Sequence, residues 1–286
     1  MPTPLITRTA TDVRQMPAFS TTPAPPIEAT AWNLPDTTVR QLVADSYQRR
    51  GYAIVHVPGV VPCAEDLRKL SAALQLGEVF TPPLYTASSH TTASGVSQLT
   101  AASGGDHPFQ DRAGQNIHCD GTLQALGQIR TTIMLCVSAA ANGGVSYLVN
   151  LVDAYADLRR VDPEAAEQLA HATALVRTST FASGHSTAGP AFARENGGSW
   201  TTRYSRTATD SYHPTAGGEA AMERALAFLD AAAQAGSAFR SEFTLRAGQA
   251  LVLANDRLGH GRTPFHDDPS APRLLLRALF TLRPLA

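Results

Sequence analysis

Short apolar runs cross the chain after residue 130, and regular helices do not separate them. We expect strands at 131–137, 147–149, 174–178, 200–204, 243–245, 250–253 and 274–282. Helical periodicity interrupts them only at 152–172, with a restart near Asp162-Pro163, and at 219–235. A doubly wound α/β sheet would alternate strands with helices regularly. The pattern therefore predicts a mainly β (α+β) domain, a sandwich or barrel with helical buttresses.

The N-terminal third of the chain contains the remaining predicted helices. Residues 1–32 are rich in Pro, Thr and Ala without a sustained period, so we expect an extended N-terminal arm before one domain at 33–286. Asp36 is a plausible cap for a helix that ends at Gly51, and a strand at 52–57 follows it. A second helix is predicted over 65–76.

Two polar segments inside the predicted domain have little periodicity. Residues 81–114 are crowded with Ser, Thr, Gly, Pro and Asp, and residues 179–212 are also largely polar. Long irregular stretches in a compact domain are usually functional or mobile. We expect both segments to be lids. For Arg112 and Arg203 within them, hydrogen bonds inside their own loops are favoured over contacts with a substrate.

The charge balance excludes several classes of partner. The chain has 23 basic and 24 acidic residues, so it lacks the basic excess that nucleic acid or an anionic membrane requires. No apolar run approaches the roughly 20 residues that span a bilayer. Three dispersed cysteines indicate neither a disulfide framework nor a zinc motif. We expect a cytoplasmic protein that acts on a small molecule.

The segment Gln115-Asn116-Ile117-His118-Cys119-Asp120 carries the first candidate metal ligands. In an extended chain His118 and Asp120 project to the same side, whereas Cys119 faces away and is expected to pack. A second such pair, at His266-Asp267-Asp268, shows that the motif alone is not specific. Its position before Pro269 favours a solvated loop.

The segment 251–280 carries a second constellation. An apolar strand ends at Asn255, a turn with His260 follows, and another apolar strand begins at Arg273. Arg273 and Arg277 share one face of that strand. A guanidinium in a strand buried on both faces requires an anionic partner. An internal salt bridge or an exposed face is the simpler interpretation, and a fork for a small-molecule carboxylate is the one we favour.

These residues together describe one site. His118, Asp120 and His260 match the two histidines and one carboxylate that bind non-haem Fe(II) in oxygenases and leave positions open. Zinc is less favoured because the set lacks thiolates.

The sequence resembles the Fe(II)/2-oxoglutarate-dependent dioxygenases of the taurine dioxygenase and clavaminate synthase-like group. The resemblance covers roughly residues 110–280. It rests on four motifs in the expected order: His118-Cys119-Asp120, the turn at 141–146, the run from Asn255 to Thr263, and Arg273-Leu274-Leu275-Leu276-Arg277.

The resemblance implies a fold, cofactors and residue roles. The fold would be a double-stranded β-helix (jelly roll), and the cofactors Fe(II), 2-oxoglutarate and O2. Arg273 and Ser146 would bind the distal carboxylate of 2-oxoglutarate. Arg277 would face its C1 carboxylate or an anionic group of the substrate. Because Asp120 is present, the resemblance implies hydroxylation, with release of succinate and CO2, and not halogenation; desaturation, epoxidation and cyclisation use the same ligands.

Substrate recognition has fewer signals. Gln115 and Asn116 directly precede the first ligand histidine and are, with Arg277, the candidates for substrate contact. The expected substrate is a small metabolite or natural-product intermediate. Two alternatives from other classes remain: a non-catalytic jelly-roll protein that binds a metal or small molecule, and a zinc-dependent hydrolase of cupin-like shape.

Overall fold

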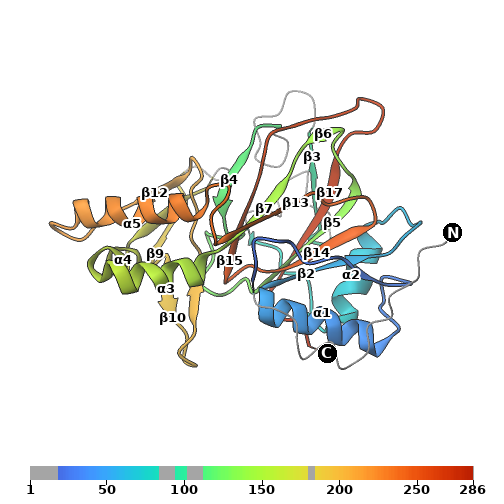
Figure 1. The fold of residues 1–286 in the computed structure, drawn as a ribbon, viewed down its shortest axis with the longest axis horizontal. Helices are drawn as coiled ribbons and strands as arrows, with labels where there is room; N and C mark the ends of the chain where they lie inside the picture. The colour runs from blue at the N-terminus through green and yellow to red at the C-terminus, as the bar shows by residue number, and fades with distance from the viewer. Residues whose placement is uncertain (1–18, 84–93, 102–111, 180–183, 286) are drawn as a thin grey trace.

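Two β-sheets pack against each other in the computed structural model, which describes residues 19–83, 94–101, 112–179 and 184–285 (Figure 1). The larger sheet has the order β1 (Ile27–Glu28), β2 (Tyr52–His56), β14 (Gln249–Ala254), β5 (Thr131–Ser138), β17 (Leu274–Phe280), β3 (Ser97–Thr100). The smaller sheet has the order β13 (Arg240–Phe243), β7 (Ser146–Asn150), β15 (Leu258–Arg262), β4 (Gln115–His118). Apart from the parallel β1–β2 pair, neighbouring strands of both sheets are antiparallel. This is the predicted jelly roll.

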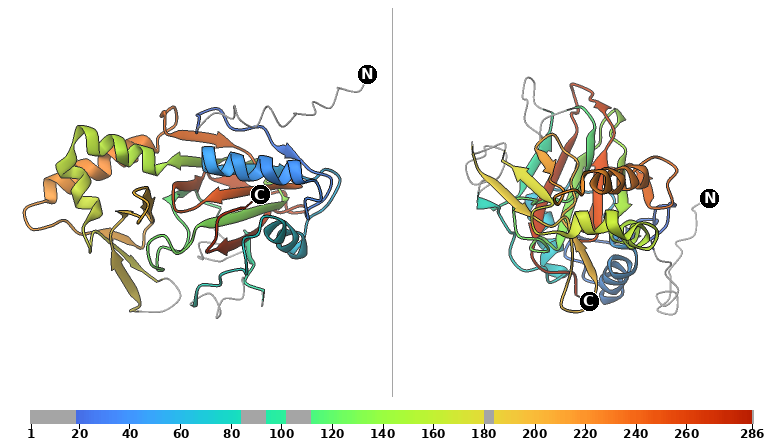
Figure 2. Two further views of the ribbon diagram at one scale, coloured as in Figure 1. Left: turned by 90° about the horizontal axis from the view of Figure 1, so that it is seen from below. Right: turned by 90° about the vertical axis from the view of Figure 1, so that its left-hand side faces the viewer.

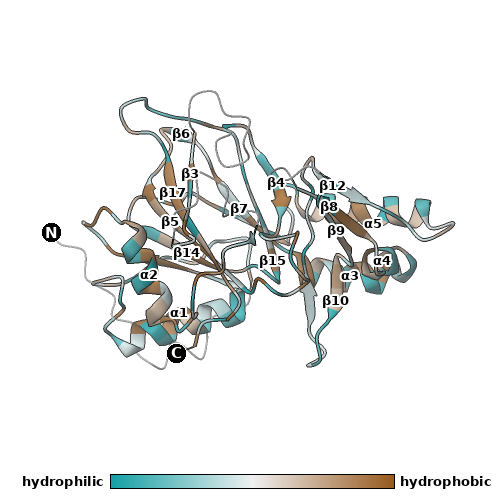
Figure 3. Cartoon of the chain, turned by 180° about the vertical axis from the view of Figure 1, so that it is seen from behind, coloured by the Kyte–Doolittle hydropathy of each residue, from teal (hydrophilic) through white to brown (hydrophobic). Residues whose placement is uncertain are grey.

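The apolar strands of the larger sheet are buried on both faces. In β14, Ala250 and Val252 belong to an outer cluster, whereas Leu251 and Leu253 pack toward the smaller sheet with Leu148. Alternate side chains of a strand point to opposite faces, so such a strand must be apolar throughout. Figure 3 accordingly shows brown along β5, β14 and β17.

Two helices cover the outer face of the larger sheet. In α1 (Thr37–Arg50), the Asp36 side chain accepts a hydrogen bond from the backbone N of Thr38, and Gly51 ends the helix at φ 80°. Helix α2 (Ala64–Ala73) contributes Leu67 and Leu70 to the same cluster. Both predicted helices are confirmed.

A lobe of helices and short strands lies beyond the smaller sheet (Figures 1 and 2). Its helices are α3 (Leu151–Val161), α4 (Pro163–Ala170) and α5 (Glu219–Ala232). Its strands are β8 (Leu175–Thr178), β9 (Ser186–Gly189), β10 (Phe192–Arg194), β11 (Trp200–Thr202) and β12 (Asp210–Tyr212). One apolar cluster joins the lobe to the smaller sheet through Ile117, Tyr147 and Val149. The lobe therefore forms a wall beside β4 and β15.

The structure corrects one element and shifts others. The turn predicted around His260 is wrong, because residues 258–262 form strand β15 between β7 and β4. The strand expected at 243–245 lies at Arg240–Phe243 instead. A two-stranded sheet of β6 (Asn142–Gly143) and β16 (Phe265–His266) occupies part of the predicted loops.

Parts of the predicted arm and lids lie outside the described residues, namely 1–18, 84–93, 102–111 and 180–183. The arm, the domain limits and the lid function stay predictions. Within the predicted arm, Ile27–Glu28 pairs with β2, and Trp32 is buried against α1 and the larger sheet. None of the helices in the described part of the chain is long and apolar enough to cross a membrane.

Gly261 allows β15 to pack closely between β7 and β4, at the place where the sequence predicted a turn. A Cβ at this position would overlap the ring of Tyr147 and lie 2.6 Å from the carbonyl oxygen of Gln115. We expect Gly261→Ala to lower the free energy of unfolding by about 1–3 kcal/mol, because neighbouring groups must move. Denaturant unfolding of the metal-free protein measures this change. Gly197→Ala is the matched control, since a Cβ there meets nothing within 4 Å; equal stability of the two variants would contradict the packing argument.

Candidate functional site

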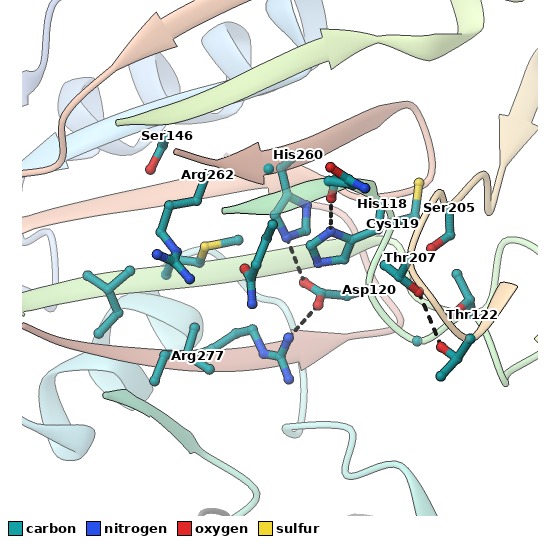
Figure 4. A pocket seen from close by; sticks show the side chains of 18 of the residues that line it. His118, Cys119, Asp120, Thr122, Ser146, Ser205, Thr207, His260, Arg262 and Arg277 are labelled. Atoms are coloured by element: carbon teal, nitrogen blue, oxygen red, sulfur yellow. Dashed lines mark hydrogen bonds and ion pairs between the residues drawn. The ribbon is translucent and has the colours of Figure 1, made fainter. Parts of the chain in front are cut away.

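The three predicted metal ligands converge at one end of the smaller sheet. His118 ends β4, Asp120 follows two residues later, and His260 lies in β15 directly opposite His118. The two imidazole rings are 4.3 Å apart, and Nε2 of His260 lies 3.7 Å from Oδ2 of Asp120. One ligand atom from each residue lies within 4.8 Å of the others. Figure 4 shows the three side chains pointing toward one another. This arrangement can hold a metal ion.

Asp120 is held from the larger sheet as well. Oδ1 accepts a hydrogen bond of 2.5 Å from Nη1 of Arg277 on β17, and Oδ2 accepts one of 2.9 Å from Thr132 on β5. The side chain of Asn255 accepts from the backbone N of Asp120 at 2.7 Å and donates to its carbonyl oxygen at 3.0 Å. It also donates to the carbonyl of Ile129. The position and rotamer of the carboxylate are thereby fixed before any ligand binds.

The protonation states of His118, Asp120 and His260, called the ligand cluster below, suit the binding of a metal ion. Burial would raise the pKa of Asp120, but the charge of Arg277, the two histidines and the Thr132 hydrogen bond lower it to about 2. Burial, reinforced by His118, lowers the pKa of His260 to about 3. Burial likewise lowers the pKa of His118, against the opposing charge of Asp120. At neutral pH the cluster is thus one carboxylate and two neutral imidazoles, which is the form that metal ions bind.

A backbone carbonyl orients the first histidine. Nδ1 of His118 lies 2.8 Å from the carbonyl oxygen of Asn116, which can only accept a hydrogen bond. Nδ1 therefore carries the proton, and Nε2 presents its lone pair to the centre of the cluster. A second hydrogen bond of this kind is usual for histidines that bind metals.

A buried arginine lies at one end of the site. Arg273 is 9% exposed and its guanidinium carbon lies 5.0 Å from the centre of the Phe265 ring. Its backbone N donates to Oδ1 of Asp267, whose side chain is only 3% exposed. The rest of the loop expected there is exposed, at His266, Asp268 and Pro269, so Asp267 alone departs from the prediction. Burial lowers the pKa of Arg273, and its guanidinium makes no ion pair within the described residues. A buried, unpaired cation is costly unless an anion binds to it.

One cavity of about 770 Å³ extends from Arg273 past the ligand cluster to the helical lobe. Near Arg273 the cavity is lined by Ser146 and Arg262, and beside the cluster by Gln115 and Asn116. Its far wall comes from β8 and the segment around residues 205–209. Figure 4 shows Ser146 and Arg262 on one side of the cluster, with Ser205 and Thr207 on the other. A volume of this size accommodates two small molecules.

The remaining predicted residues have structural contacts. Arg203 donates to the backbone carbonyls of Pro190, Thr122 and Leu175. Only Pro190 lies in the same polar segment, so the contacts are structural but reach beyond the loop in which they were expected. Arg112 lies 3.6 Å from Asp267.

Cys119 is buried in the apolar cluster of the lobe, as expected for a packing residue.

Sequence reasoning assigned no role to three residues of the site. Asn255 lay in the motif that carried the resemblance, but its contact with Asp120 joins segments far apart in the chain. Thr132 is a polar residue in an otherwise apolar strand, on the same face as Met134 and Cys136. A polar side chain on that face indicates a buried hydrogen-bond partner. Arg177, in the short strand β8, offered the same kind of signal.

The side chain of Asn255 should be needed to place Asp120. We expect Asn255→Ala to weaken Fe(II) binding about 10- to 100-fold, as loss of groups that orient metal ligands does. The free energy of unfolding should also fall by about 1–3 kcal/mol, because three backbone groups, the N–H and carbonyl of Asp120 and the carbonyl of Ile129, lose buried partners. Anaerobic Fe(II) titration and denaturant unfolding measure the two effects. Asn196→Ala, at an exposed position, is the control; identical Fe(II) affinities in the two variants would exclude the positioning role.

Comparison with known proteins identifies relatives with the same chemistry. A uridine-5'-phosphate dioxygenase from Amycolatopsis sp. is 38% identical over 247 residues, which cover 85% of this chain and 90% of that protein. A uridine-5'-phosphate dioxygenase from Streptomyces sp. is also 38% identical, over 257 residues, 87% of this chain and 90% of its own length. These matches favour the oxygenase over the non-catalytic binding protein and the zinc hydrolase.

Solved structures agree on the fold. Asparagine oxygenase, in a complex with Fe(II), 3-hydroxyasparagine and succinate, superposes with a TM-score of 0.64 at 16% identity, covering 87% of this chain and 81% of that one. The non-heme iron oxygenase OrfP, with Fe and alpha-ketoglutaric acid, gives a TM-score of 0.62 at 16% identity, with 88% and 86% covered. Residues 17–279 match the family described as taurine catabolism dioxygenase TauD, TfdA. The chain therefore belongs to this family and is an Fe(II)- and 2-oxoglutarate-dependent dioxygenase.

Proposed function

We propose that His118, Asp120 and His260 hold the iron of this dioxygenase. Their converging ligand atoms, their protonation states and the hydrogen bond from His118 to Asn116 support the assignment. Two histidines and one carboxylate leave coordination positions open for small ligands. Iron bound there would supply the activation of O2 that couples decarboxylation of 2-oxoglutarate to substrate oxidation. Because Asp120 is present, hydroxylation is the proposed outcome.

The buried Arg273 is the proposed partner of the distal carboxylate of 2-oxoglutarate. A planar guanidinium matches a carboxylate with two parallel hydrogen bonds, and burial strengthens each of them. Ser146 lines the same end of the cavity and is the proposed second donor. Arg277 lies against Asp120 and beside the cluster, which suits a contact with the C1 carboxylate or with an anionic group of the substrate.

Replacement of Arg273 tests this assignment. Arg273→Met should weaken 2-oxoglutarate binding by about 1.5–3 kcal/mol, roughly 10- to 100-fold, since charge-assisted hydrogen bonds are lost. Anaerobic titration of the Fe(II) protein with 2-oxoglutarate gives the dissociation constant. Arg273→Lys, which keeps the charge but not the fork, should fall between wild type and Arg273→Met. Wild-type affinity in Arg273→Met would remove the residue from this role.

We propose that the substrate is a pyrimidine nucleoside 5'-monophosphate, specifically uridine-5'-phosphate. The observation that carries this proposal is the 38% identity to two uridine-5'-phosphate dioxygenases along nearly the whole chain. The cavity supports it, because about 770 Å³ leaves room for a nucleotide beside 2-oxoglutarate. Gln115 and Asn116 line this cavity and remain the proposed substrate contacts next to the metal.

Succinate formation distinguishes this substrate from others. With Fe(II), 2-oxoglutarate, ascorbate and O2, we expect uridine-5'-phosphate to raise succinate production well above the substrate-free rate and to be consumed in equal amount. Uridine and adenosine-5'-phosphate are the comparison substrates, and both should respond less. Removal of iron with EDTA should abolish turnover, and added Fe(II) should restore it. A protein that decarboxylates 2-oxoglutarate equally with and without every nucleotide would contradict the proposed substrate.

We also propose that the protein works in the cytoplasm. Cys63, Cys119 and Cys136 are all free thiols, and thiols persist in reducing compartments.

A further inference from the structure

An arginine of the helical lobe faces the metal cluster from the side opposite to Arg273. Arg177 lies in β8 and lines the same cavity as His118 and His260. Arg177 thus shares a cavity with the metal site, although it belongs to another part of the fold.

The lining of the cavity carries more positive than negative charge. Four arginines contribute to it within the described residues, Arg177, Arg262, Arg273 and Arg277, whereas Asp120 is the one acidic side chain among them. Fe(II) and 2-oxoglutarate bring equal and opposite formal charges, so their binding does not remove this excess. Asp210 pairs with Arg177 from behind the lining and offsets part of the excess. The positive charge that remains favours a second anion, such as a phosphate monoester, which carries about −1.5 to −2 charges at neutral pH.

The position of each arginine indicates which one is available to that anion. Arg262 and Arg273 lie over the same ring, with guanidinium carbons 4.4 and 5.0 Å from the centre of Phe265. Both thus belong to the end assigned to 2-oxoglutarate. Arg277 is held by Asp120 directly beside the metal site, which suits the C1 carboxylate, the first of the two anions proposed for it above. Arg177 is the remaining cation, on the wall where Figure 4 shows Thr207 and Ser205.

The surroundings of Arg177 hold it in one orientation. Its Nη1 donates to Oγ1 of Thr207 and, at 3.0 Å, to Oδ1 of Asp210. Asp210 is itself anchored by the hydroxyl of Ser205 and by the backbone N of Thr207. The Thr207 hydroxyl donates to Oδ2 of Asp210 at 2.7 Å, so its single proton is already used. Thr207 and Asp210 therefore position the arginine and do not themselves donate to a ligand.

The other edge of the same guanidinium carries two further N–H groups. Within the described residues, Nε and Nη2 of Arg177 make no hydrogen bond, and the side chain is 20% exposed. Two parallel N–H donors on a rigid, half-buried fork match the oxygens of a phosphate group.

We propose that Arg177 binds the 5'-phosphate of the nucleotide substrate, with Asp210 and Thr207 as positioning residues. The inference rests on the proposed function and adds the residue by which the protein would bind a nucleotide in preference to its nucleoside. Substrate phosphate and 2-oxoglutarate would then occupy opposite sides of the iron, each with its own arginine.

Binding without turnover tests the subsite directly. The Fe(II) protein loaded with 2-oxoglutarate is titrated without O2 with uridine-5'-phosphate, uridine and inorganic phosphate by calorimetry. Arg177→Met should weaken uridine-5'-phosphate binding about 10- to 100-fold and abolish phosphate binding. Affinities for uridine and 2-oxoglutarate should change by less than about threefold. Arg160→Met, at a side chain 71% exposed on α3, is the matched control and should leave all affinities unchanged.

Two further variants keep the result interpretable. Arg177→Met leaves the buried Asp210 without its cation, so Arg177→Lys and the double variant Arg177→Met/Asp210→Asn are compared by thermal unfolding and by the same titrations. Both should fold and should still bind uridine-5'-phosphate more weakly than wild type. Retained phosphate affinity in folded Arg177 variants overturns the inference. So does an equal loss of affinity for uridine, or a loss of phosphate affinity in Arg262→Met and not in the Arg177 variants.

The wild-type protein separates this inference from the proposed substrate. Binding of inorganic phosphate through Arg177, without oxidation of uridine-5'-phosphate, would overturn the substrate and leave the anion subsite. A wild type that binds neither phosphate nor uridine-5'-phosphate overturns both.

Discussion

The ion pair between Asp120 and Arg277 connects the two sheets at the point where the chemistry takes place. Asp120 extends from the end of β4 in the smaller sheet, and Arg277 lies on β17 in the larger one. Burial alone would favour a neutral carboxyl, and the arginine opposes that tendency. Since removal of one partner leaves an uncompensated buried charge, the pair ties the protonation state of the proposed metal ligand Asp120 to the packing of the two sheets.

The two arginines proposed to bind anions line one cavity but belong to different parts of the fold. Arg273 belongs to the sheet sandwich, which the family shares, whereas Arg177 belongs to the lobe that closes the other side. With the proposed assignments, changes in the lobe would alter which substrate binds without disturbing 2-oxoglutarate. This division fits the general observation that one scaffold supports many specificities through its peripheral segments.

The local signals around His260 show why one part of the site was predicted wrongly. Gly259 and Gly261 resemble turn residues when only the neighbouring sequence is considered. In the structure they are strand positions where Ile117, Leu151 and Tyr147 approach the backbone too closely for a Cβ. The glycines serve packing between β4 and β7, which is a property of strands distant in sequence. A similar limit applies to the side chain of Asp267, which is buried and accepts a hydrogen bond from the backbone N of Arg273, six residues later in the chain.

Local patterns in the chain were enough to predict the fold class and the faces of the strands, and the family resemblance implied the cofactor chemistry. Two-residue alternation is local, so it placed Arg273 with Arg277 and set Cys119 apart from His118 and Asp120. Which distant residues meet is visible only in the folded chain: His118 lies beside His260, Asn255 beside Asp120, and Arg177 across the cavity from Arg273. The reason is physical, because strand order and register between sheets follow from packing of the whole chain.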